Sequence, residues 1–195
     1  MPLSSPAARE HIHTRKVQCE GFRRADGLWD IEGHITDTKT YGFGNRERGQ
    51  VPPGAPIHDM SIRLTVDDAL TIRGVEVLTE ASPYRICADV APNFQRLVGL
   101  TIGPGFRKQV RERLGGTEGC THLVELLGPV GTTAFQTVVP LARRDSDRLS
   151  QTDAGADAAP RRLPPLLNSC YAFSDEREVV ARQWPGFVRN PAANE

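Results

Sequence analysis

The sequence predicts an α+β fold, in which an antiparallel sheet of two hairpins precedes a helical half. Strand patterns come first along the chain and helix patterns follow, an order typical of α+β rather than alternating α/β proteins. The clearest strand covers residues 57–67, IHDMSIRLTVD, where one set of side chains is largely apolar and the alternate set is polar. Such alternation indicates an antiparallel strand with one buried and one solvated face.

Two hairpins account for the predicted sheet. The predicted strands are 13–22, 28–38, 57–67 and 71–79. The first hairpin turns at residues 24–27, RADG, which have the composition of a tight turn. Residues 41–55 are rich in Gly and Pro, so we expect them to form a loop between the hairpins.

Apolar residues recur at helical spacing in two segments after the strands. The first segment covers residues 87–98 and contains Pro92, which lacks a backbone donor, so we expect an irregular first turn. The second covers residues 106–114 and is followed by Gly115 and Gly116, which are typical of a helix terminus.

A third helix is expected to begin near residues 117–120. Leu123 and the leucines that follow it would form its apolar face. Pro129 and Gly131 predict a bend or a break before the helix resumes at residues 134–139.

Composition divides the chain into a domain at residues 12–142, a flexible linker at 143–162 and a C-terminal segment at 163–188. The linker is polar, small and nearly free of bulky apolar groups, which predicts disorder. The C-terminal segment regains apolar and aromatic residues, so we expect it to pack back on the domain. These residues are Leu163, Leu166, Leu167, Cys170, Tyr171, Phe173, Trp184 and Phe187.

The charge balance indicates neither a nucleic acid nor a membrane as partner. The chain has 24 Lys and Arg residues against 24 Asp and Glu residues. It contains no run of about 18 apolar residues, and its first residues lack the apolar core of a signal peptide. We therefore expect a cytoplasmic protein, in which the four cysteines are thiols or metal ligands rather than disulfides.

Four residues of metal-ligand type lie where a sheet edge and helix starts could converge. His58 lies on the apolar face of its strand, and Cys87 heads the apolar stripe of the first helix. Cys120 and His122 lie at the start of the third helix, whose N-terminus would favour the thiolate of Cys120. Thiolates and imidazoles are ligands that suit Zn²⁺ or an iron–sulfur cluster.

Geometry limits this set. Residues two apart on a helix do not share a face, so Cys120 and His122 meet one metal only if the residues before Leu123 are not helical. Strand alternation points Asp59 away from His58, so Asp59 joins the site only if the strand begins later than residue 57.

Each residue also has a packing interpretation. A lone buried Cys is usually a small hydrophobe, and a lone His on an apolar face is usually a satisfied core residue. Core packing is the preferred interpretation of Cys19 and Cys170. Solvent exposure is preferred for His11, His13 and His34, the last of which shares a strand face with acidic residues.

Several motifs, in order from about residue 11 to 185, resemble a bacterial family known as domain of unknown function 2889. They are HTRKV, RRADGLWDIEGHITDTK, PIHDMSIRLT, SPY-x-x-C, GG-x-x-GCTHL and NSC. This resemblance implies no activity. It places His58, Cys87, Cys120 and His122 in segments typical of the family.

Residues 56–137 also resemble the iron–sulfur cluster assembly scaffold proteins. Those proteins have a strand that opens with Cys-Gly-Asp, a hairpin, a helix headed by Gly-Cys and a later helix headed by Cys. The resemblance implies that His58, with Asp59, and the thiols of Cys87 and Cys120 surround one metal or cluster. Here a histidine replaces the first cysteine, no glycine precedes Cys87, and Cys-Thr-His stands where the family has His-Cys. These departures weigh against cluster assembly and transfer more than against metal binding.

Three functions follow from these observations. The first is a metal-binding accessory or carrier protein of scaffold type, which holds zinc or an iron–sulfur cluster and passes it to another protein. The second is a cysteine-dependent hydrolase or transferase with Cys120 as nucleophile and His58 as base. The third is a non-catalytic interaction module in which these side chains only pack.

Overall fold

The computed structural model describes residues 3–150, 164 and 166–189. The chain divides into two compact units, with the boundary after Arg148. The first unit contains an antiparallel four-stranded sheet and several helices, which confirms the predicted α+β class. Of the linker predicted at 143–162, residues 151–162 lie outside the described part of the chain.

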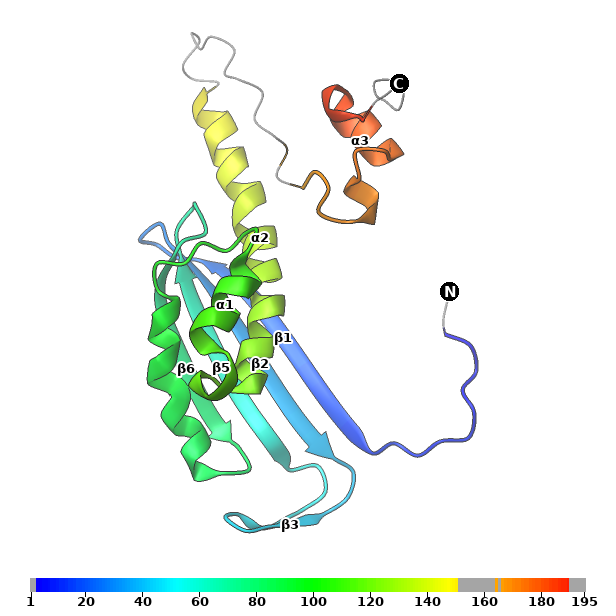
Figure 1. Ribbon diagram of the computed structural model, residues 1–195, viewed down its shortest axis with the longest axis vertical. Coiled ribbons are helices and arrows are strands. Elements are labelled where there is room, and N and C mark those ends of the chain that lie inside the picture. Colours follow the sequence, from blue (N-terminus) through cyan, green and yellow to red (C-terminus); the bar gives the residue numbers. More distant parts are fainter. Residues whose placement is uncertain (1–2, 151–163, 165, 190–195) are drawn as a thin grey trace. The chain divides into compact units, whose positions relative to one another are not determined.

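The sheet is a meander of two hairpins in the order β1-β2-β5-β6 (Figure 1). Its strands are β1 (His13–Arg23), β2 (Trp29–Lys39), β5 (Pro56–Val66) and β6 (Ile72–Ala81). All neighbours are antiparallel, and β2 pairs with β5 to join the two hairpins. The four strands agree with the predicted ones to within about two residues at each end.

The predicted loop at residues 41–55 contains a small hairpin of its own. β3 (Phe43–Asn45) pairs with β4 (Gly49–Val51). The Asn45 side chain accepts hydrogen bonds from the backbone of Glu47 and Arg48, and Gly49 has a positive φ of 70°. These turn contacts allow such short strands to pair. Strands of three residues are too short to show an alternating apolar pattern in the sequence.

Helices cover one face of the sheet (Figure 1). They are η1 (Arg85–Leu97), α1 (Phe106–Leu114), η2 (Gly116–Glu118) and α2 (Thr121–Ser150). The first predicted helix is a 3₁₀ helix over its whole length, so the irregularity expected near Pro92 extends through all of η1.

The prediction of a break in the third helix is wrong. α2 runs without interruption through Pro129 and Pro140 to Ser150, eight residues into the predicted linker. Each proline removes one backbone hydrogen bond, but the helix already buries an apolar stripe against the sheet, and propagation costs less than nucleation. Leu126 and Val130, on either side of Pro129, are fully buried in that stripe.

The core lies between this helical layer and the inner face of the sheet. β2 and β5 supply alternate buried residues, as the sequence pattern predicts. Gly33 on β2 leaves room for α2, because a Cβ atom there would overlap the Val130 side chain. The opposite face of the sheet is polar, and Arg63 there bridges Glu32 and Glu76.

In the second unit, the described residues 166–189 contain short helices. They are η3 (Tyr171–Phe173), α3 (Glu178–Gln183) and η4 (Pro185–Phe187). Val180 is buried, and the rings of Phe173 and Trp184 lie 5.4 Å apart. Packing of this segment against the first domain stays a prediction.

Candidate metal site

A polar row crosses three strands where the apolar pattern of the sheet ends. Arg15 on β1 lies opposite Asp37 on β2, which in turn lies opposite His58 on β5. Residues directly opposite in antiparallel strands share a face of the sheet. Asp37 and His58 therefore lie on the helix-covered face, one step beyond the buried pair Ile35 and Met60.

Asp37 is the centre of this row. Its side chain is only 1% exposed, and it is the single charged residue that is buried in the described part of the chain. Oδ1 accepts hydrogen bonds from Arg15 Nε at 2.8 Å and His13 Nε2 at 3.0 Å. Oδ2 accepts from Arg15 Nη2 at 2.9 Å and His58 Nδ1 at 3.0 Å. Four donors therefore use the hydrogen-bonding capacity of the carboxylate.

These contacts keep Asp37 ionised. Burial is the largest single influence and acts to raise the pKa of Asp37, but the hydrogen bonds from Arg15, His13 and His58 together hold it well below its usual range. Because an ionised carboxylate only accepts hydrogen bonds, Nδ1 of His58 carries the proton toward Asp37. The Nε2 lone pair of a neutral His58 is then free.

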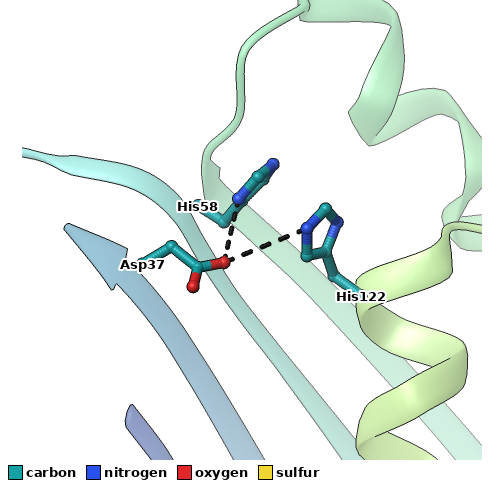
Figure 2. A group of neighbouring side chains, drawn as sticks. All are labelled: Asp37, His58 and His122. Carbon is teal, nitrogen blue, oxygen red and sulfur yellow. Dashed lines mark hydrogen bonds and ion pairs between the residues drawn. The ribbon is translucent and has the colours of Figure 1, made fainter. Parts of the chain in front are cut away.

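α2 brings a second imidazole to the same carboxylate. His122 Nε2 lies 3.9 Å from Asp37 Oδ2, and the rings of His58 and His122 are in contact, with centroids 3.7 Å apart and planes tilted by 32° (Figure 2). Ligand atoms from Asp37, His58 and His122 all lie within 4.8 Å of one another. Figure 2 shows that each ring turns one nitrogen to Asp37 and the other away from it.

Both imidazoles are neutral near pH 7. Burial lowers the pKa of His58, and the neighbouring His122 lowers it further. Burial also lowers the pKa of His122, with Arg15 acting in the same direction. Neutral imidazole is the form that binds metals.

The histidines line a pocket of about 370 Å³ that also receives two thiols. Cys87 of η1 and Cys120, the residue before α2, both line it, as does Met60 of β5. Cys120 Sγ lies 3.9 Å from His122 Nδ1 and 3.9 Å from Met60 Sδ. Four residues predicted from the sequence, drawn from three separate segments of the chain, therefore line one cavity.

The geometric condition on Cys120 and His122 is met for Cys120 only, because α2 begins at Thr121 and His122 is already helical. Cys120 precedes the first helical residue, Thr121, and its carbonyl accepts the Val124 N–H at 2.9 Å. Because Cys120 is outside the helix, its side chain and that of His122 can meet despite their spacing of two.

Asp59 does not join the pocket. It points to the opposite face of the sheet, where its Oδ1 lies 2.6 Å from His34 Nε2. β5 already begins at Pro56, so alternation places Asp59 and His58 on different faces.

Asp37, Arg15 and His13 were not among the site residues predicted from the sequence. A signal for Asp37 was present, because it follows Trp29, Ile31, Gly33 and Ile35 at spacing two and so continues their apolar face. A charged residue at such a position needs buried partners. His13 was expected to be solvated, and its ring is indeed partly exposed, but it also donates to Asp37.

The remaining cysteines lie elsewhere. Cys19 packs against the core as predicted, and burial raises the pKa of its thiol. The prediction that Cys170 is a core residue is wrong, because its side chain is exposed.

Comparison with known proteins gives a family and no activity. The model of a family described as "Protein of unknown function (DUF2889)" matches residues 13–136, a range that contains every residue of the pocket. No curated protein and no solved structure matches the chain, so the likeness to iron–sulfur scaffold proteins has no counterpart among them. None of the helices in the described residues combines the length and apolarity needed to cross a bilayer.

Proposed function

The chain belongs to the DUF2889 family of proteins of unknown function, and we propose that it binds a metal at this pocket and serves as an accessory or carrier protein. The observation that carries the proposal is a pair of neutral imidazoles in contact, backed by one buried carboxylate, in a pocket shared with two thiols. Packing alone gives no reason to bury an ionised carboxylate beneath two histidines.

The structure suggests a role for each side chain. His58 would bind through Nε2, since Nδ1 donates to Asp37. His122 would bind through Nδ1, the nitrogen that lies nearer Cys120. Cys120 and Cys87 would supply thiolates. Asp37 would act behind the histidines, where carboxylates commonly orient metal-bound imidazoles and strengthen them as ligands.

This donor set suits Zn²⁺, and its thiols are also those that an iron–sulfur cluster would use. The pocket is much larger than one ion requires, since a water molecule takes up about 30 Å³. Structural zinc sites are closed by protein ligands, whereas open sites keep a position for another molecule. An open site is consistent with a metal or cluster that is handed to another protein.

The proposal can be tested on protein purified without oxygen. The measurements are the metal content, the acid-labile sulfide content and the absorption spectrum. We expect stoichiometric metal in the wild type and a sharp loss in Cys120→Ser and His58→Gln. Cys19→Ser and Cys170→Ser are matched controls outside the pocket and should retain metal. A Cys120→Ser protein with full metal content would contradict the ligand assignment, and a folded, metal-free wild type would contradict the function.

The Asp37–His58 hydrogen bond also favours a second candidate, a cysteine-dependent hydrolase or transferase. A carboxylate that orients a neutral imidazole is the arrangement that prepares a general base. However, the imidazole nitrogen in contact with Cys120 belongs to His122 rather than His58. Rapid stoichiometric alkylation of Cys120 in the metal-free protein would support a catalytic role over a metal-carrier role, provided that alanine substitution of His58 or of His122 blocks the alkylation.

A further inference from the structure

The pocket contains a third sulfur that sequence patterns assign to the core. Met60 is 1% exposed and belongs to the inner face of β5, between His58 and Ile62. Its side chain also lines the pocket, and its Sδ atom lies 3.9 Å from Cys120 Sγ. A thioether and a thiol therefore face each other beside the two imidazoles.

The separation of the two sulfur atoms fits a single ion. Two sulfurs each about 2.3 Å from one ion lie about 3.8–4.0 Å apart at tetrahedral or trigonal angles. The observed separation of Met60 Sδ and Cys120 Sγ, 3.9 Å, is within that range. Cys120 Sγ is also 3.9 Å from His122 Nδ1, so an imidazole nitrogen lies beside the same thiol.

The thioether discriminates between metals. Protein zinc sites use thiolate, imidazole and carboxylate ligands, whereas a thioether beside a thiolate selects the softer copper(I) ion. We infer that the metal carried by this pocket is copper(I), with Met60 in place of Cys87 as the second sulfur ligand beside Cys120, and with His58 and His122 as imidazole ligands. This inference rests on the proposed metal-binding function and specifies its cargo.

A copper(I) site also accounts for the position of Asp37. The carboxylate lies behind both imidazoles and is occupied by Arg15 and His13, so it is held away from a role as a ligand. The ligand set then consists of soft or intermediate donors only, while the hard oxygen donor orients the rings.

Competition titrations of the metal-free full chain without oxygen test the inference. Copper(I) is titrated against a coloured copper(I) chelator, and zinc against a zinc chelator, for the wild type and Met60→Leu. Leucine keeps the volume and apolarity of methionine but removes the sulfur. We expect Met60→Leu to lower copper(I) affinity on the order of tenfold to a hundredfold and to leave zinc affinity unchanged.

Three results would overturn the inference, and they can be told apart. If Met60→Leu binds copper(I) as well as the wild type, Met60 only packs. If the wild type binds zinc but not copper(I), the copper assignment fails while the proposed function stands. If it binds neither ion and also purifies without iron and acid-labile sulfide, the proposed function fails as well.

A second measurement does not depend on the variant folding. X-ray absorption at the selenium edge of selenomethionine-labelled wild type, loaded with copper(I), should show copper as a neighbour of selenium. Labelled protein loaded with zinc is the matched control and should show no metal neighbour. Absence of a selenium–copper contact in loaded protein would exclude Met60 as a ligand.

Discussion

Asp37 shows how one residue organises the site. Burying an ionised carboxylate is costly unless it is paired and hydrogen-bonded. Arg15 offsets this cost with two hydrogen bonds to the two carboxylate oxygens, while its third nitrogen contacts Glu125 of α2 at 3.0 Å. The same guanidinium therefore neutralises Asp37 and links β1 to the helix that carries His122. We expect the site and the stability of the domain to depend on this pair.

Replacing Arg15 with methionine should lower the free energy of unfolding by about 2–3 kcal/mol, because it leaves Asp37 buried with only imidazole donors. Chemical denaturation of the metal-free protein measures the change. Arg63→Met is the matched control: Arg63 also bridges two carboxylates, but Glu32 and Glu76 are exposed, so the loss should be below about 1 kcal/mol. Equal losses in the two variants would show that burial of Asp37 has no special cost.

Acidification should destabilise the metal-free protein in two steps. The pKa of His58 and that of His122 are lower in the folded state than their ordinary 6.5, so the unfolded chain takes up protons first as pH falls below about 6.5. The lowered pKa of Asp37 adds stability that is present above about pH 4 and is lost below it. Denaturation at pH 7, 5.5 and 3 should give falling stability, with a shallower first step in His58→Gln. A rise between pH 7 and 5.5 would contradict the neutral assignment of the imidazoles.

At the scale of elements, the approach of α2 to the sheet positions His122. Gly33 lies beneath the helix, and a Cβ atom there would overlap Val130 and lie 3.2 Å from Leu126 Cγ. The helix can thus pack directly on the β2 backbone two turns after His122. The close contact fixes the height of α2 above Asp37, which is also on β2.

Gly33→Ala should therefore lower the free energy of unfolding by about 1–3 kcal/mol, since the added methyl group overpacks the interface. Thermal or chemical denaturation provides the measurement. Gly74→Ala, in β6, is the matched control, because its Cβ would meet nothing closer than Thr65 Cβ at 3.5 Å. Val130→Ala in the Gly33→Ala background should recover part of the loss, and a failure to recover any would place the strain elsewhere.

Apolar alternation predicted the strands well, whereas proline positions did not predict where the long helix ends. Alternation located β5 and the other long strands because one face of each is buried in the same core. Pro129 predicted a break that burial of Leu126 and Val130 overrides, a tertiary effect that local propensity does not contain. The extension of α2 beyond residue 142 likewise follows from a helix that is already formed.

The candidate site divides in a similar way. Residue type and element ends were enough to select His58, Cys87, Cys120 and His122, which line one pocket in the structure. The partners of Asp37 required the register of three strands, since Arg15 lies 22 positions away in sequence and meets it only through pairing. The register of strand pairing depends on the whole sheet, so it cannot be predicted from any single segment of the sequence.

At the scale of the whole molecule, the core and the pocket belong to the first unit. The buried core cluster extends from Trp29 to Val138, and the pocket is lined by residues between His58 and His122. The family match at residues 13–136 covers nearly the same range. These boundaries predict that the second unit is dispensable for folding of the first and for metal binding.

A fragment of residues 1–150 should therefore unfold cooperatively and bind metal as the full chain does, because it contains the sheet, α2 and all pocket residues. Denaturation followed by circular dichroism, together with metal analysis, makes the comparison. A fragment that ends at residue 120 is the control: it lacks α2 with Leu123, Leu126 and Val130, and exposes the apolar face of β2 and β5, so it should not fold. If the 1–150 fragment also failed to unfold cooperatively, the C-terminal segment would have to contribute to the core, as its apolar composition first suggested.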